Sequence, residues 1–288
     1  MKKFMNFQSG DRRKYYGLCL PEVLMALFVG AMVSTALLWG WRGMSDCVSL
    51  MVLERKTQVK TAHAIALLMP KVLNGALGIP GVPEEYQKTF SDIPALGAWR
   101  KPVTIVPNNR AQNLGIDWGD ELRIVYAVPT ANKVQSVFPE KQEVVLSVPP
   151  SPNKLRGTTG KAGKTFNWVI FPGASRPLRL KGIRGRILQL SELSEDVASI
   201  PVGASLHLLR AAKIYVKMGP SGGPELYCHD VTYQNSQPVV SGIEKASFAY
   251  NEEKGVLEVC FLVKHKKKSQ EVNTAFRLRN MPLKAEDS

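Results

Sequence analysis

The chain has 288 residues, of which 44% are hydrophobic, and its formal net charge is +14. A chain of this length can bury the core of one or two domains, and this hydrophobic content excludes a largely disordered protein. The positive charge favours contact with anionic lipid, cell-wall polymer or DNA, and it does not bear on the fold.

The chain begins with a basic leader, which is followed by a long apolar stretch. Residues 1–17 contain five basic side chains and one acidic side chain, whereas residues 18–41 contain a single charged residue, Glu22. As a helix, residues 18–41 would be about 36 Å long, which is enough to cross the roughly 30 Å hydrocarbon core of a bilayer. Because basic residues before an apolar segment stay in the cytoplasm, we expect the leader there and the rest of the chain across the membrane.

Glu22 is the unusual residue of the apolar stretch. A carboxylate inside a membrane-spanning segment costs about 2.5–3.5 kcal/mol, and such residues are usually functional or paired. Cleavage between Gly17 and Leu18 would place a new amino terminus one helical turn before Glu22. Since that amine on a neighbouring copy or a related subunit would neutralise the carboxylate, we expect Glu22 to act in subunit assembly.

Residues 17–22, Gly-Leu-Cys-Leu-Pro-Glu, resemble the cleavage motif of prepilins. In that motif a glycine precedes a hydrophobic residue, usually Phe, then Thr, Leu, an apolar residue or Pro, and Glu; Leu18 and Cys19 differ from the commonest Phe and Thr. The resemblance implies that the prepilin peptidase cleaves after Gly17 and that Leu18 becomes the N-methylated first residue of the mature chain. The leader is longer than that of many major pilins, which favours a minor pilin or a pseudopilin. An ordinary signal anchor is the alternative, but it would have no reason to keep Glu22.

The helical pattern continues beyond the apolar stretch through residues 42–70. Apolar residues recur there at spacings of three and four, which predicts an amphipathic helix. Pro70 is the first strong helix breaker, so we expect one helix of about 50 residues, with residues 18–41 in the membrane and residues 42–70 covering the exported domain. The apolar stripe of the second half consists of Val48, Met51, Val52, Val59, Ala62, Ile65, Ala66 and Met69.

The rest of the sequence predicts an irregular connection followed by a β-rich domain. Residues 71–118 are rich in Pro and Gly and indicate a long connecting loop with short helical or strand pieces. Residues 119–288 show strand-like alternation between turn-forming residues, which predicts an antiparallel β-rich exported head. The predicted fold class is therefore α+β, with a long N-terminal helix packed on an antiparallel β-sheet. We expect strands at 119–126, 142–148, 166–171, 186–190, 205–218, 225–233, 239–250, 256–263 and 272–278, a surface loop at 149–164 and a hairpin turn at 219–224.

Three segments of the predicted head carry a further resemblance. Residues 119–126 have the form small-Asp-x-Leu-x-hydrophobic-x-Tyr, which is similar to a segment of PilW-type minor pilins and of J-type pseudopilins of type II secretion. Residues 239–250 and the closing residues 276–280 are similar to the C-terminal sheet of PilW-type proteins. The resemblance implies a pilin-like fold.

Two cysteines lie in the predicted head. An oxidising compartment would allow a disulfide between Cys228 and Cys260, and the alternative is two unpaired thiols on strands. The sequence contains no spacing of the zinc-binding type. We therefore expect neither a metal nor a cofactor.

Residues 228–230, Cys-His-Asp, have the residue types of a nucleophile, a base and an orienting acid. Consecutive strand residues point to opposite faces, so His229 should not reach Cys228. No nucleophile elbow, P-loop or dinucleotide-binding motif occurs in the sequence. We therefore expect that the protein is not an enzyme.

The basic run at residues 264–268, Lys-His-Lys-Lys-Lys, is predicted to lie at a hairpin tip. There it could contact DNA phosphates, which is a sequence-independent interaction. The alternative is a solubilising turn that prevents pairing between sheet edges. The lysines concerned are Lys264, Lys266, Lys267 and Lys268.

The resemblance implies a structural, non-enzymatic minor pilin of the PilW type, which helps to initiate or cap a type IV pilus. The implied partners are the prepilin peptidase, other minor pilins, the major pilin, the inner-membrane assembly platform and the lipid bilayer. The implied location is the inner membrane, with the head outside the cytoplasm, and then the pilus tip. A J-type pseudopilin of a type II secretion system shares every feature used above and is the main alternative. A DNA-uptake protein and a membrane-anchored enzyme are less favoured interpretations of the same sequence.

Overall fold

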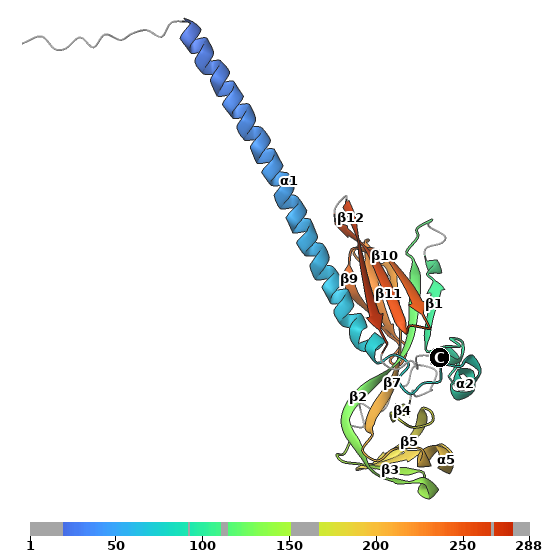
Figure 1. Cartoon of the computed structure of the whole chain (residues 1–288). Coiled ribbons are helices and arrows are strands. Elements are labelled where there is room, and N and C mark those ends of the chain that lie inside the picture. The colour runs from blue at the N-terminus through green and yellow to red at the C-terminus, as the bar shows by residue number, and fades with distance from the viewer. Residues whose placement is uncertain (1–19, 92, 111–114, 151–166, 266–267, 279–288) are drawn as a thin grey trace, which may run out of the picture. The chain divides into compact units, whose positions relative to one another are not determined.

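The computed structural model describes residues 20–91, 93–110, 115–150, 167–265 and 268–278 (Figure 1). The chain divides into two compact units, residues 1–54 and 55–288, and the boundary lies within the first helix. The described residues form a long N-terminal apolar helix and antiparallel sheets. The predicted α+β class is therefore confirmed.

The first helix, α1 (Leu20–Leu73), contains 54 residues. At 1.5 Å per residue it is about 81 Å long, and none of its glycines interrupts it. Pro70 was expected to end the helix, but it lies inside the last turn and the helix ends at Leu73. A proline removes one backbone donor and therefore one hydrogen bond of the ladder. The side-chain amide of Asn74 donates a hydrogen bond to the carbonyl oxygen of Pro70 at 2.9 Å, so one carbonyl group of the helix end is satisfied.

Two antiparallel sheets follow among the described residues. In that part of the chain the larger sheet has nine strands in the order β1-β2-β3-β6-β5-β4-β7-β8-β9, and the smaller has three in the order β10-β11-β12. The strands are β1 (Val103–Pro107), β2 (Asp120–Phe138), β3 (Glu143–Leu146), β4 (Trp168–Ile170), β5 (Leu178–Arg184), β6 (Ile187–Leu190), β7 (Ser205–Met218), β8 (Pro224–Asp230), β9 (Asn235–Ser241), β10 (Ile243–Asn251), β11 (Val256–His265) and β12 (Lys268–Arg277).

Part of the larger sheet closes on itself. Strand β2 pairs with β7 as well as with β3, so β2, β3, β6, β5, β4 and β7 pair in a ring. Every strand of this ring contributes to one buried apolar cluster, which includes Leu146, Phe171 and Leu188. The short helix α5 (Ser194–Ala198) adds Val197 to the same cluster.

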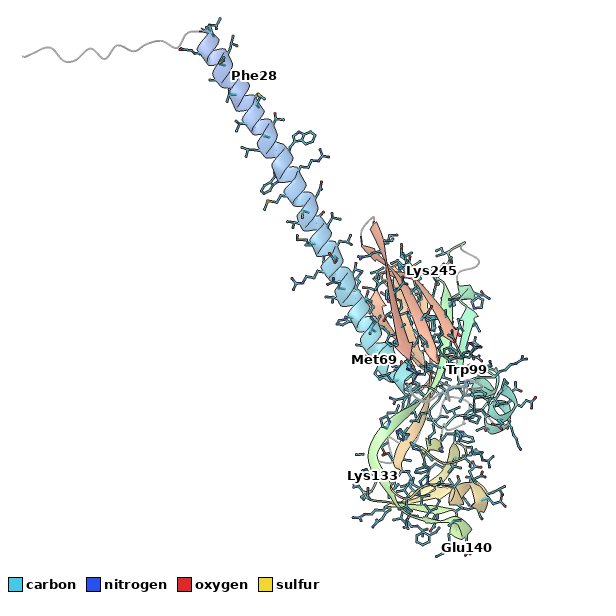
Figure 2. All side chains as sticks on the ribbon, in the orientation of Figure 1. Phe28, Met69, Trp99, Lys133, Glu140 and Lys245 are labelled. Atoms are coloured by element: carbon cyan, nitrogen blue, oxygen red, sulfur yellow. The ribbon has the colours of Figure 1, made fainter. Side chains whose placement is uncertain are left out.

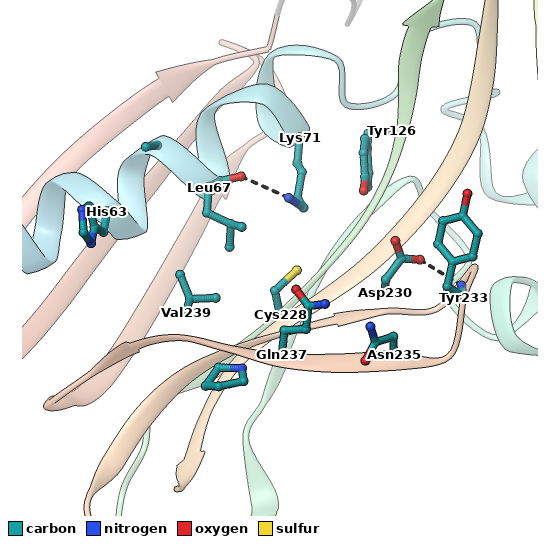
Figure 3. A pocket seen from close by; sticks show the side chains of 12 residues that line it. His63, Leu67, Lys71, Tyr126, Cys228, Asp230, Tyr233, Asn235, Gln237 and Val239 are labelled. Atoms are coloured by element: carbon teal, nitrogen blue, oxygen red, sulfur yellow. Dashed lines mark hydrogen bonds between the residues drawn. The ribbon is translucent and has the colours of Figure 1, made fainter. Parts of the chain in front are cut away.

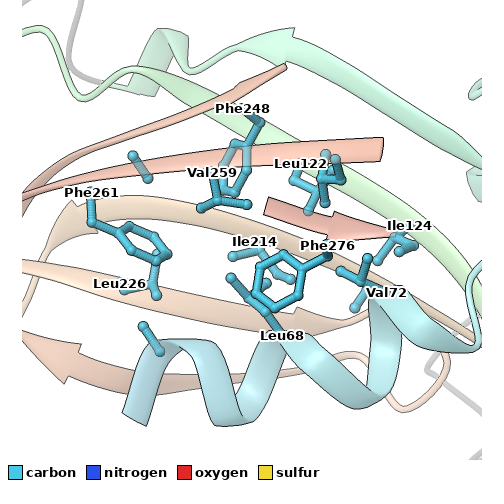
Figure 4. Close-up of a cluster of buried hydrophobic side chains, with 14 of the residues drawn as sticks. Leu68, Val72, Leu122, Ile124, Ile214, Leu226, Phe248, Val259, Phe261 and Phe276 are labelled. Carbon is cyan, nitrogen blue, oxygen red and sulfur yellow. The ribbon is translucent and has the colours of Figure 1, made fainter. Parts of the chain in front are cut away.

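The main core lies between the end of α1 and the two sheets (Figure 4). Leu68 and Val72 of α1 belong to one buried cluster with Ile214 of the larger sheet and with Phe261 and Phe276 of the smaller sheet. The alternation of these strands places the apolar residues on one face and the polar residues on the other. This core joins residues 55–73 of α1 to both sheets.

A third cluster covers the opposite face of β2 and β7. It contains Tyr86 of α2 (Pro83–Thr89), Leu96 of α3 (Pro94–Gly97) and Trp99, which pack with Val125 and Ala211. The described part of residues 71–118, which we expected to be a long connecting loop with short helical or strand pieces, contains α2, α3 and β1.

Several strand ends differ from the prediction by a few residues, such as the start of β12 at Lys268 instead of residue 272, and three differences are larger. Strand β2 continues to Phe138, because it pairs with β7 and then with β3 after the regular alternation has ended. Strand β5 was not predicted, although Leu178 and Leu180 alternate with two basic residues. The segment 239–250, predicted as one strand, is divided between β9 and β10 by Gly242, whose φ of +77° favours glycine.

Candidate functional site

The apolar half of α1 forms the first candidate surface. Nearly every residue from Leu20 to Glu54 is exposed, and Phe28 and Trp41 are 65% and 74% exposed (Figure 2). Within the described residues, α1 contains the one stretch that is long and apolar enough to cross a membrane, and the rest of the chain does not bury that stretch. A continuous apolar surface of this size is stable only when lipid or protein covers it.

Glu22 lies in the first turn of α1, where a carboxylate also interacts favourably with the helix dipole. It is the single charged residue from Leu20 to Trp41. Gly17 and Leu18, the predicted cleavage and methylation residues, lie outside the described residues. The cleavage and the methylation therefore stay predictions.

The second half of α1 has two apolar faces. The head covers one of them, and most residues of the predicted apolar stripe lie on the other. The buried residues are Thr57, Thr61, Ala64, Leu68 and Val72. Our expectation for the stripe was therefore wrong, since of its residues after position 54 only Ile65 packs partly against the main core. The exposed residues of this outer stripe are Val59, Ala62, Ala66 and Met69.

A pocket of about 720 Å³ lies beside the end of α1 and is lined by residues of α1, β2, β8 and β9 (Figure 3). The ammonium group of Lys71 donates a hydrogen bond to the carbonyl oxygen of Leu67 at 3.2 Å and lies 5.8 Å from the ring centre of Tyr126. Asp230 accepts backbone hydrogen bonds from the two residues that follow Val231, at 2.8 and 3.1 Å. The pocket thus presents one cation and one carboxylate, and the carboxylate is held by its own turn.

The side chains of the Cys-His-Asp segment alternate between the two faces of β8, as expected for a strand. Cys228 and Asp230 both line the pocket, whereas His229 is not among the lining residues. Burial raises the pKa of the Cys228 thiol, so this sulfur is protonated at neutral pH. Among the described residues no base is hydrogen-bonded to Cys228, and the charge of Lys71 only partly opposes the effect of burial.

Cys228 and Cys260 are both free, so the disulfide considered for this pair is not formed. The reason is the direction of the two side chains. Cys228 packs against the main core from β8, whereas Cys260 lies between the buried Val259 and Phe261 on β11 and therefore points away from that core. The Cys260 thiol donates a hydrogen bond to the Glu271 carboxylate at 3.1 Å.

The basic run at the tip of β11 is only partly described. The Lys264 ammonium forms an ion pair with Glu244 at 2.6 Å, and this hydrogen bond holds the pKa of Glu244 below its usual value. Lys266 and Lys267 lie outside the described residues, as does the side chain of Lys268. The contact with DNA stays a prediction.

A buried carboxylate on β2 was not predicted as a site residue. Glu121 is 3% exposed and accepts hydrogen bonds from Arg110 at 2.6 Å and from Arg123 at 2.8 Å. Arg110 also covers the ring of Tyr215 at 3.6 Å. The sequence shows Glu121 and Arg123 two residues apart on one strand, which could have indicated their ion pair. It does not show that Arg110, from a separate loop, joins them.

Comparisons of the chain with protein-family models, with curated proteins and with solved structures find no match.

Proposed function

We propose that the chain is a structural minor pilin of the PilW type, which is cleaved after Gly17, methylated on Leu18 and built into the start or the tip of a type IV pilus. The observation that carries this proposal is α1. Its first half is apolar and uncovered, its second half is held by the head, and the outer stripe of Val59, Ala62, Ala66 and Met69 stays exposed. A helix of this kind supports both a membrane-inserted state and packing against other helices.

Glu22 gives this packing its specificity. In lipid its carboxylate costs about 2.5–3.5 kcal/mol, and an ion pair with the methylated amino terminus of a neighbouring subunit would offset that cost. Movement of α1 from lipid into a bundle of subunit helices is therefore favoured. The small side chains of Ala62 and Ala66 in the outer stripe leave room for a neighbouring helix to approach closely.

Mass spectrometry of the membrane form tests processing. We expect a mature chain that begins with N-methyl-Leu18, and we expect Gly17→Ala to slow its formation. A native chain that still begins at Met1 contradicts the proposal.

Incorporation into filaments tests the role of Glu22. Glu22→Ala should be cleaved normally but recovered poorly in sheared filaments, whereas the matched variant Glu54→Ala, in the same helix beyond the apolar stretch, should be incorporated. Equal recovery of both variants contradicts the assigned ion pair. A deletion strain that keeps its pili but loses secreted proteins would instead identify a J-type pseudopilin.

A further inference from the structure

A row of basic residues crosses the face of the larger sheet that points away from the main core. Arg123 on β2 lies directly opposite Lys213 on β7, and Lys213 lies directly opposite His229 on β8. Residues directly opposite each other in antiparallel strands project from the same face, and adjacent strands are about 4.8 Å apart. Three basic side chains therefore stand side by side, and each of them is partly exposed.

Within the part of the chain that the structure describes, these basic side chains are not matched by an equal number of carboxylates. Like charges directly opposite each other destabilise a sheet. Among the described residues, Glu121 is the carboxylate on this face beside Arg123 and Lys213, and its two oxygens already accept hydrogen bonds from Arg110 and Arg123. Burial lowers the pKa of His229, and the charge of Asp230, which follows it on β8 and points to the opposite face, opposes that shift. Among the described residues, Lys213 forms no ion pair within 4.0 Å. Burial lowers the pKa of Lys213, and the charges of Arg123 and Arg110 lower it further, against the opposing effect of Glu121.

The charge balance indicates the charge of the anion that the row would bind. Among the described residues on this face, Arg110, Arg123 and Lys213 carry three positive charges and Glu121 carries one negative charge, so two positive charges are left when His229 is neutral. A phosphate monoester or inorganic phosphate carries about −1.5 to −2 at pH 7, which matches this surplus. A single carboxylate or a phosphodiester carries one negative charge and leaves part of the surplus.

The neighbouring aromatic rings argue against a single-stranded nucleic acid. Tyr215 and Tyr227 lie beside the row, but each is only 5% exposed. Arg110 covers the first ring at 3.6 Å and Lys217 lies 3.9 Å from the centre of the second. Bases therefore have no open ring on which to stack.

We infer that Arg123, Lys213 and His229 form a binding site for a dianionic phosphate group. The ammonium of Lys213 supplies the main charge, the guanidinium of Arg123 supplies donors beyond the one used by Glu121, and His229 closes the row on β8. Ser236 lies opposite His229 on β9, and its hydroxyl, which is 3.4 Å from the Tyr215 hydroxyl, stands at the end of the row. This inference does not depend on the proposed function.

Isothermal titration calorimetry of the full-length chain in a nonionic detergent, with inorganic phosphate as the probe, tests the site. We expect saturable binding at one site, and we expect Lys213→Gln to weaken it by about tenfold or more, because it removes a charge-assisted hydrogen bond. The matched control is Lys181→Gln, an exposed lysine on β5 that changes the net charge equally. It should leave binding unchanged.

Methyl phosphate provides the second arm. Equal binding of methyl phosphate identifies a phosphomonoester group as an acceptable ligand, whereas binding of inorganic phosphate alone identifies the free ion. Lys213→Met, which keeps the aliphatic part of the side chain, is the second variant if Lys213→Gln unfolds. Absence of saturable binding to the wild-type chain, or equal weakening by Lys213→Gln and Lys181→Gln, would overturn the inference.

Discussion

The carboxylate of Asp120 accepts a hydrogen bond from the backbone N–H of Phe248 at 3.0 Å, and this contact joins the start of β2 to the middle of β10. Two neighbouring contacts support it: Gly119 forms an isolated bridge with Ala246, and the N–H of Ala246 donates to the carbonyl oxygen of Trp118 at 3.2 Å. Residues 119–126 and 239–250, which carry the resemblance to pilin heads, thus meet in the structure. The junction connects the two sheets around the main core.

Gly119 is required at this junction for two reasons, which a pair of variants can separate. Its φ is +79°, and an added Cβ would collide with the carbonyl oxygen of Ala246. Gly185 has a φ of +60° but open space around its Cα, so Gly185→Ala measures the conformational strain alone. We expect Gly185→Ala to lower the free energy of unfolding by about 1 kcal/mol and Gly119→Ala by about 3 kcal/mol or more. Denaturant unfolding checks this; equal losses would show that the collision is relieved.

The sequence predicted which segments are helices and strands better than it predicted which face of each is buried. Period and composition were sufficient for the long helix and for most strands, because exposed or half-buried elements keep a regular alternation. They were not sufficient for the face of α1 that meets the head. The buried residues Thr57 and Thr61 are polar, and the more apolar stripe with Val59 and Met69 is exposed. A helix with two apolar faces has no single hydrophobic direction.

Neighbouring residues of α1 test this assignment of faces. Leu68 is fully buried in the main core, whereas Met69 is 48% exposed. We expect Leu68→Ala to lower the free energy of unfolding of the head by about 2–5 kcal/mol. Met69→Ala should change it by less than about 0.5 kcal/mol. Denaturant unfolding of the full-length chain in detergent measures both, and the reverse order would show that the predicted stripe is the one that packs on the head.

The free thiols of the head give a second test of side-chain direction. When the chain is unfolded by a denaturant without a reductant and in the presence of iodoacetamide, we expect Cys228 and Cys260 each to add one alkyl group. In the folded chain both should react slowly, since burial raises the pKa of Cys228, and burial together with the Glu271 hydrogen bond raises the pKa of Cys260 to about 11. The wild-type chain should unfold at the same temperature with and without a reductant, as its control, the double variant Cys228→Ser with Cys260→Ser, does. A wild-type chain whose unfolding temperature falls on reduction would contradict the structure.

The site around Glu121 could be predicted only in part. The alternation of β2 places Glu121 and Arg123 on one face, which the sequence shows. The sequence does not show that Lys213 and His229 lie beside Arg123, because that depends on the register between β2, β7 and β8. Register is set by contacts between strands that are distant in the chain.

Glu121 should make the stability of the head depend on pH in the acid range. Burial alone raises the pKa of this carboxyl, but the hydrogen bond from Arg123 and the charges of Arg110, Arg123 and Lys213 outweigh it, so its pKa in the folded chain lies below its usual value of 4.5. A carboxyl whose pKa is lowered by folding contributes stability that is fully present above the unfolded value and is lost as the pH falls through the folded value.

The change to test is Glu121→Gln, which should lower the free energy of unfolding at pH 7 by about 2 kcal/mol or more, because it leaves two arginines without their carboxylate. As the pH falls below about 4.5, the wild-type chain loses the contribution of this ion pair and the variant does not, so the difference between them should shrink. Urea unfolding at pH 7, 5, 4 and 3 measures that difference. Glu258→Gln, an exposed residue on β11, is the matched control and should leave the free energy at pH 7 nearly unchanged. A difference between wild type and Glu121→Gln that stays constant from pH 7 to pH 3 would contradict the assigned role of the arginines.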